Sequence, residues 1–313
     1  MVTLNYVRRL YKDEEKNNVQ AICTDGEFLY IACREGGDTA EVDLLPATLK
    51  KISLDGSLVL ENADTCYCHA NGMAYCDKDG MLYIATLGRT ENAVEVPEGE
   101  LSVQQYGTIA VVDPETLAFV HMFNVNEQLR QIGLGNLSSK RGVWEQLDCP
   151  VLSQVNYYPS LGIFICQLRP YILEGDDVRR QGLVFFDTDW DLLGFKEIPY
   201  NSYSGNMATD GLYYYMSLNQ SGSKLKLSSI LDMDFNVICQ MFFQSPVSNE
   251  LENFAIIGQT LYATFNTKPI SILEFAIEYS SAPDETNPED DPVPPEDEPT
   301  PPPPESEGTS YPD

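Results

Sequence analysis

Hydrophobic and polar positions along the chain follow a unit that recurs about every 50 residues. Each copy has a polar start, a short apolar strand, a tight turn and a second strand rich in aromatic residues. The five copies span residues 20–32, 71–85, 156–166, 206–215 and 253–263. One such hairpin cannot bury its apolar face alone, so several copies must stack, and this period is typical of a β-propeller or a related array.

Two further strands follow each hairpin, separated by Asp-Gly or Asp-Pro turns such as Asp55-Gly56. Four antiparallel strands of this kind form one propeller blade. The fifth copy has only residues 270–277 after its hairpin, and the unassigned strand 4–11 supplies the strand that it lacks. We therefore predict an all-β fold over residues 1–281, a single propeller of five four-stranded blades closed by the N-terminal strand.

A six-bladed ring is the alternative, and it requires a degenerate unit within residues 126–150. The segment 126–134 instead suggests a short helical insertion. Five blades is the count that the clear repeats support.

The last 32 residues differ sharply in composition from the rest. Residues 282–313 contain eleven acidic residues, eleven of the twenty prolines and no Lys or Arg. Such a segment has little to bury, so we predict an acidic, Pro-rich disordered tail. It acts either as a solubilising spacer or as a docking segment for a basic or Pro-reading partner.

Charge and hydropathy exclude several partners. The formal net charge is −29, and removing the eleven acidic tail residues leaves −29 + 11 = −18 on the propeller. This excess of acid argues against binding to a nucleic-acid backbone.

The start of the chain resembles no signal peptide and no apolar run is long enough to span a membrane, so we expect a cytoplasmic or virion-associated protein. The cysteines lie in strand patterns, where we expect mostly free thiols.

Loop lengths distinguish the two ends of the predicted ring. The connections between second and third strands are long in the first three blades, at roughly residues 34–46, 87–106 and 167–181. They lie at the same end as the start of each first strand, and we call that end the long-loop face. Long loops on a rigid scaffold usually carry binding residues.

Polar residues at the blade starts should converge near the axis at this face. Asn side chains are also common at turns for structural reasons, and that interpretation stays open beside a binding role. Tyrosines near the same face suit sugars or proteins as ligands. The candidate ligand-binding residues are His69, Asn71, Tyr106, Asn156, Tyr157, Tyr171, Tyr203, Asn206 and Asn253.

One motif resembles a known class of propeller. The segment Cys68-His69-Ala70-Asn71-Gly72-Met73, followed by residues 78–85, resembles strand starts in bacterial and phage propellers and, more loosely, in lactonase-like and Tyr-Val-Thr-Asn repeat propellers. The lactonase-like family holds an ion in its channel with Glu, Asn and Asp. This implies Ca²⁺ as the cofactor and Glu252, Asn156 and Asn206 as metal ligands, although Gly72 stands where Asp is common.

Two functions follow from these patterns. The first is a non-catalytic, ligand- or partner-binding propeller that uses the long-loop face to bind a carbohydrate, a peptide or a protein surface, as in phage or bacterial adhesion. The alternative is a metal-dependent lactonase- or glycosidase-like hydrolase. The chain has only two histidines and lacks the Gly-x-Ser-x-Gly motif, which favours the first function.

Overall fold

The computed structural model describes eleven segments of the chain: residues 2–14, 18–34, 47–63, 70–86, 107–134, 137–138, 150–173, 178–198, 204–218, 222–266 and 269–279. Residues Val2–Tyr279 form one compact unit. The predicted tail, residues 282–313, lies outside the described residues.

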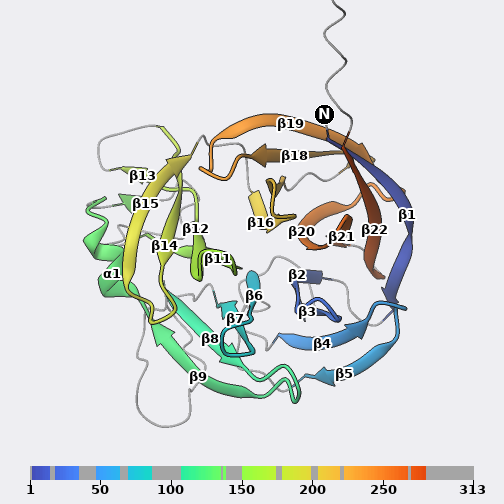
Figure 1. Cartoon of the computed structure of the whole chain (residues 1–313), viewed down its shortest axis with the longest axis horizontal. Helices are drawn as coiled ribbons and strands as arrows, with labels where there is room; N and C mark the ends of the chain where they lie inside the picture. Colours follow the sequence, from blue (N-terminus) through green and yellow to red (C-terminus); the bar gives the residue numbers. More distant parts are fainter. Residues whose placement is uncertain are drawn as a thin grey trace, which may run out of the picture. The chain divides into compact units, whose positions relative to one another are not determined.

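Five four-stranded antiparallel sheets stand around a central axis as the blades of a propeller (Figure 1). The predicted fold is therefore confirmed. Blade 1 consists of β2 (Asn18–Thr24), β3 (Phe28–Arg34), β4 (Thr48–Ser53) and β5 (Leu58–Asn62). Blade 2 consists of β6 (Gly72–Cys76), β7 (Met81–Ala85), β8 (Thr108–Val112) and β9 (Phe119–Asn124).

The other three blades repeat this order from the axis outward. Blade 3 consists of β11 (Leu152–Tyr158), β12 (Ile163–Leu168), β14 (Gln181–Phe186) and β15 (Leu192–Ile198). Blade 4 consists of β16 (Ser204–Thr209), β17 (Tyr214–Leu218), β18 (Leu225–Leu231) and β19 (Val237–Gln244). Blade 5 consists of β20 (Glu250–Ile257), β21 (Thr260–Asn266), β22 (Ile270–Tyr279) and β1 (Val2–Asp13).

The N-terminal strand closes the ring as predicted. β1 pairs antiparallel with β22, from Val2 opposite Tyr279 to Asp13 opposite Ile270. A buried ion pair then joins β1 to blade 1, because Lys50 Nζ lies 2.7 Å from Asp13 Oδ2. The same ammonium lies 2.8 Å from Glu61 Oε2. β1 is thus held by strand pairing within blade 5 and by the ion pair to blade 1.

Two small elements depart from the regular blade pattern. The helix α1 (Asn126–Gln131) follows blade 2, in the segment where the sequence predicts a short helix. A two-stranded sheet pairs β10 (Leu137–Ser138) with β13 (Ile172–Leu173), and the sequence pattern did not predict it. Neither element adds a blade, so the six-bladed alternative is wrong.

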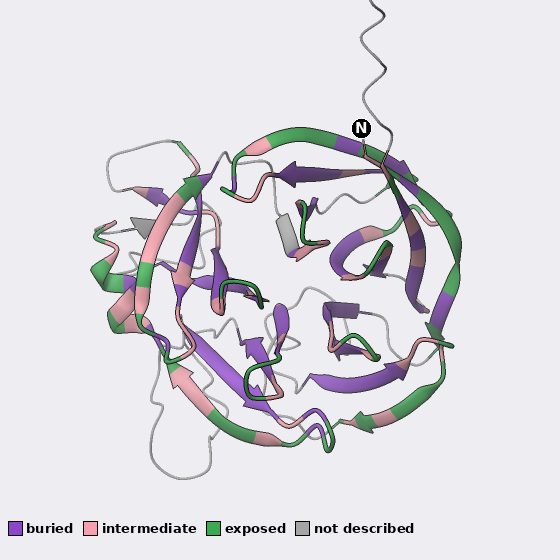
Figure 2. Ribbon diagram, viewed as in Figure 1, coloured by how far each residue is buried: buried purple, intermediate pink, exposed green. Residues whose placement is uncertain are grey.

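The hydrophobic core consists of five clusters, one between each pair of adjacent blades. Inner strands have neighbours on both sides, so consecutive residues are buried, as in β2, where six of seven are. The outer strands have one exposed face, which Figure 2 shows as a broken green rim. Ile22 and Cys23 are adjacent in β2 but belong to two different clusters. This alternation explains why the inner strands are apolar on both faces.

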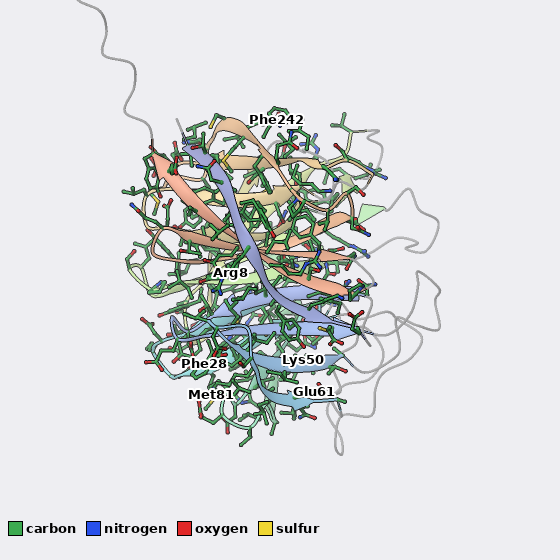
Figure 3. All side chains as sticks on the ribbon, turned by 90° about the vertical axis from the view of Figure 1, so that its right-hand side faces the viewer. Arg8, Phe28, Lys50, Glu61, Met81 and Phe242 are labelled. Carbon is green, nitrogen blue, oxygen red and sulfur yellow. The ribbon has the colours of Figure 1, made fainter. Side chains whose placement is uncertain are left out.

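The turns between first and second strands define the opposite end of the ring, which we call the short-turn face. They comprise residues 25–27, 77–80, 159–162, 210–213 and 258–259. Figure 3 shows Phe28 and Met81, which follow two of these turns, toward one end, and Lys50 and Glu61 toward the other.

A tyrosine–aspartate pair fixes the turn in three blades. The Tyr30 hydroxyl donates to Asp25 Oδ2 at 2.6 Å, and the Tyr83 hydroxyl donates to Asp79 Oδ2 at 2.5 Å. Tyr215 makes the same bond to Asp210. In each case the other carboxylate oxygen accepts backbone N–H groups of the turn. Most acidic residues at these turns therefore serve the hairpin itself.

Candidate functional site

A pocket of about 420 Å³ opens on the axis at the short-turn face. The second halves of all five inner strands line it, together with the turns that follow them. The aromatic residues of the lining are Tyr75, Tyr157, Tyr158, Tyr214 and Phe254. Its size falls within the range of small-molecule sites, and its walls belong to the rigid inner ring. This pocket is the candidate site.

Asn156 supplies a free hydrogen-bond donor to the pocket. It lies on β11 opposite Ile165, and its Nδ2 atom is buried without a hydrogen-bond partner among the described residues. Corresponding positions in the other blades carry small residues, such as Ala74 and Ala255, which face a tyrosine on the second strand. A buried amide N–H without an acceptor is costly, so a ligand that brings an acceptor here gains affinity.

Two carboxylates line the pocket, and they differ in what they already bind. Asp25 accepts backbone N–H bonds from Glu27 and Phe28 and the hydroxyl of Tyr30. Burial is the main cause of the raised pKa of the Tyr157 phenol, and the neighbouring side chains of Cys76 and Asp77 contribute to it. A carboxylate can accept about four hydrogen bonds, so Asp77 keeps acceptor capacity that Asp25 has largely used.

The thiol and several phenols of the lining stay protonated at neutral pH. Burial raises the pKa of the Cys23 thiol well above its usual range. Burial is also the main cause of the raised pKa of Tyr75, of Tyr157 and of Tyr214. Thiolates and phenolates are the nucleophilic forms of these groups, so the lining offers hydrogen-bond donors rather than activated nucleophiles.

Toward the long-loop face, polar side chains of the described inner strands bind each other. Gln20 Nε2 donates to Asn18 Oδ1 at 2.5 Å, and Asn253 Nδ2 donates to the carbonyl oxygen of Gln20. The Glu252 carboxylate accepts from the Asn266 amide. These side chains bind each other and lie buried.

The predicted candidate residues separate into two groups at opposite ends of the axis. Asn71 lies just before the start of β6, and Asn253 is the fourth residue of β20. Asn156 and Tyr157 lie near the end of β11, at the short-turn face, so placing them at the long-loop face was wrong. The cause is that β11 starts at Leu152, and Gln154 is the residue of blade 3 that corresponds to Asn253.

Tyr171, another candidate, is not part of the described pocket lining. Tyr171 lies in the connection between second and third strands, but its side chain is only 4% exposed within the core cluster between blades 2 and 3. Asn206 lies on β16, where the structure describes the backbone only. His69, Tyr106 and Tyr203 lie outside the described residues.

Two of the proposed Ca²⁺ ligands, Glu252 and Asn156, lie at different positions along the channel. Asn156 and Ala255 line the same pocket, and Glu252 precedes Ala255 by three residues. Three strand residues span roughly 10 Å, so the Glu252 carboxylate and the Asn156 amide occupy different levels of the channel. In the described parts of the chain, no group of three or more His, Cys, Asp or Glu side chains is placed to hold a metal ion.

Comparison with known proteins supports the fold alone. The chain matches no protein-family model and no curated protein sequence. A solved structure of glutaminyl cyclase from Myxococcus xanthus superposes with a TM-score of 0.51 at 12% identity, covering 89% of this chain and 98% of that one. A gluconolactonase of Xanthomonas campestris gives a TM-score of 0.43 at 11% identity, covering 85% and 88%. The class is therefore a β-propeller.

Sequence analysis missed several residues of the pocket. Tyr75, Asp77 and Tyr214 all line it, and none was a candidate. They lie at the ends of first strands and the starts of second strands, where the pattern indicated only hairpin turns. A usable signal was present, because Asp77 lies in a turn that already has a second acid, Asp79, bonded to Tyr83.

No helix in the described part of the chain is long and apolar enough to cross a membrane.

Proposed function

We propose that this protein is a non-catalytic binding protein that holds a small ligand in the axial pocket of its short-turn face. The observation that supports this most is the pocket itself, about 420 Å³ in volume and lined by all five inner strands. Its aromatic side chains supply contact area, and Asn156 supplies a donor that has no partner in the described protein. This combination of apolar walls and few polar groups is typical of ligand sites.

Binding is favoured over nucleophilic catalysis by the thiol or the phenols of the lining. Raised pKa values, caused mainly by burial, hold Cys23 and Tyr157 in their neutral forms at pH 7. A thiol or a phenol acts as a nucleophile in its ionised form. The metal-dependent hydrolase stays a prediction. Binding of a carbohydrate, peptide or protein at the long-loop face also stays a prediction.

The test is a ligand-observed NMR screen of chemically diverse small molecules against the full chain. We expect hits that Asn156→Trp abolishes, since an indole at this position fills the pocket. Leu161→Trp is the matched control, because Leu161 belongs to the turn that follows the same strand and is 59% exposed. Absence of any hit with the wild-type chain, or hits that survive Asn156→Trp unchanged, would refute the proposal.

A further inference from the structure

The charge of the axial pocket has one sign. Its described lining contains the carboxylates of Asp25 and Asp77 and no Lys, Arg or His. The propeller as a whole is also acidic, with −18 formal charges after the tail is removed. The net negative charge of the propeller repels an approaching anion, and the two carboxylates of the lining repel it within the pocket. The same charges attract a cation.

Asp77 is the carboxylate that can bind such a cation. The carboxylate oxygens of Asp25 already accept two backbone N–H groups and the Tyr30 hydroxyl. Asp79, in the same turn as Asp77, accepts the Tyr83 hydroxyl and the Met81 N–H. The Asp77 side chain is exposed and lies near the Tyr157 phenol, whose pKa is raised by burial and, less strongly, by Cys76 and Asp77. Asp77 therefore has oxygen lone pairs open to a ligand.

Aromatic residues line the same space, and the side chains of Tyr75 and Tyr157 are half-buried. Tyr157 belongs to β11 and Tyr75 to β6, and Tyr214 and Phe254 come from blades 4 and 5. Tyr214 and Tyr158 pack against each other with ring centroids 5.5 Å apart. Ring faces attract cations through the aromatic quadrupole, most strongly where water is excluded.

We propose that the axial pocket selects an organic cation: its ammonium group pairs with Asp77 among the tyrosine rings, and its hydrogen-bond acceptor meets Asn156 Nδ2. This inference rests on the proposed binding function and specifies the chemistry of the ligand. The donor and the free carboxylate lie on neighbouring blades, 3 and 2, so one small molecule that carries an ammonium group and an oxygen atom can reach both.

The test compares cations with neutral molecules of similar shape by titration calorimetry. Choline is paired with 3,3-dimethylbutan-1-ol, in which carbon replaces the charged nitrogen, and phenethylamine is paired with 2-phenylethanol. We expect at least one cation to bind the wild-type chain about tenfold or more tightly than its neutral partner. Asp77→Asn should remove most of that difference.

Asp79→Asn is the matched control, because it removes the same charge from the same turn at a residue outside the pocket lining. The preference for the cation should survive this change. Equal affinity for cation and neutral partner, or no binding of either cation at millimolar concentration, would overturn the inference. If the NMR screen still gave hits that Asn156→Trp abolishes, the pocket would stand as a binding site for another chemical class. If it gave none, the binding function itself would fail.

Discussion

Gly72 determines how closely the inner strands of blades 2 and 3 approach each other. A Cβ atom at this position would lie 2.6 Å from Gln154 Cα and 2.8 Å from the backbone nitrogen of Val155. These are backbone atoms of β11, and they cannot rotate away. An aspartate is therefore excluded where lactonase-like propellers commonly have one, and the departure from that family pattern has a steric cause.

Replacing Gly72 with alanine should destabilise the propeller by about 1–3 kcal/mol, because β6 and β11 must move apart to admit the methyl group. Urea unfolding followed by tryptophan fluorescence measures this. Gly194→Ala is the matched control, since Gly194 also lies within a strand and a Cβ there would meet nothing within 4 Å. The control should be neutral or slightly stabilising. Equal stability of the two variants would contradict the steric argument.

Single residues of the site were the hardest part to predict from sequence. Asn156 was recognised as a candidate, but at the wrong end of the axis, because an asparagine before an aromatic pair resembled the start of a strand. Four residues that precede it, Leu152 to Val155, are buried strand residues. The availability of Asp77 depends on which carboxylates bind backbone N–H groups, and only the folded hairpins determine that.

At the scale of the hairpin, the tyrosine–aspartate pair is a repeated stabilising device. Blades 1, 2 and 4 use it, whereas blade 5 has Gly258 in the turn and Tyr262 on the strand without the aspartate. Burial, followed by the hydrogen bond to aspartate, raises the pKa of Tyr30, of Tyr83 and of Tyr215. All three phenols therefore stay neutral donors through the physiological range.

Tyr30→Phe and Tyr83→Phe should each reduce the free energy of unfolding by about 1–2 kcal/mol, because each leaves a turn carboxylate without its phenol donor. Tyr262→Phe serves as the control with no such carboxylate, and it should cost less. This loss of unfolding free energy is expected at neutral and acidic pH. A phenol whose pKa is raised in the folded state stabilises below pH 10 and loses that contribution as pH rises further.

Thermal melts at pH 7 and at pH 11 measure both effects. The wild-type chain should melt at a lower temperature at pH 11, and each of the two variants should lose less than the wild type does. Equal alkaline losses in all chains would show that these phenols do not govern the response.

The strands and turns themselves were predictable from the sequence because each is determined by residues that lie close together in the chain. Apolar strands with Asp-Gly turns between them gave four strands per unit, and the segment from Asn126 gave the helix. The pairing of β10 with β13 could not be predicted, since two-residue strands carry no periodic signal. Strand register in blade 3 was also beyond the pattern, because its turn, residues 159–162, lacks the aspartate that marks the turns of blades 1, 2 and 4.

For the whole molecule, closure of the ring depends on Asp13 at the end of β1. The side chains of Asp13 and Lys50 are 6% and 5% exposed, so their ion pair is almost dry. Burial opposes the charge on Lys50, but hydrogen bonds to Asp13 and Glu61 outweigh it and raise the pKa of the ammonium. Breaking one partner of a buried pair is far more costly than breaking an exposed one.

Asp13→Asn should therefore destabilise the chain by about 3 kcal/mol, near the lower end for buried pairs because Glu61 still contacts Lys50. Glu14→Gln is the control: Glu14 neighbours Asp13 in sequence and pairs with Lys12, but both side chains are largely exposed. It should cost less than about 0.5 kcal/mol. Differential scanning calorimetry compares the two variants, and similar melting temperatures would contradict a structural role for the ion pair between Asp13 and Lys50.

The pairing of β1 with β22 also sets an order on synthesis. β1 leaves the ribosome before the other strands of the propeller, yet its hydrogen-bonding partner is made about 260 residues later. Blades 1 to 4 contain their own strands and can pair as they emerge, whereas blade 5 must wait for both ends of the chain. Contacts this distant in sequence form slowly. Until the last strand arrives, β1 carries an unpaired edge with the exposed side chains Tyr6 and Val7, and this interval is when the nascent chain is most open to capture by a chaperone or by another copy of itself.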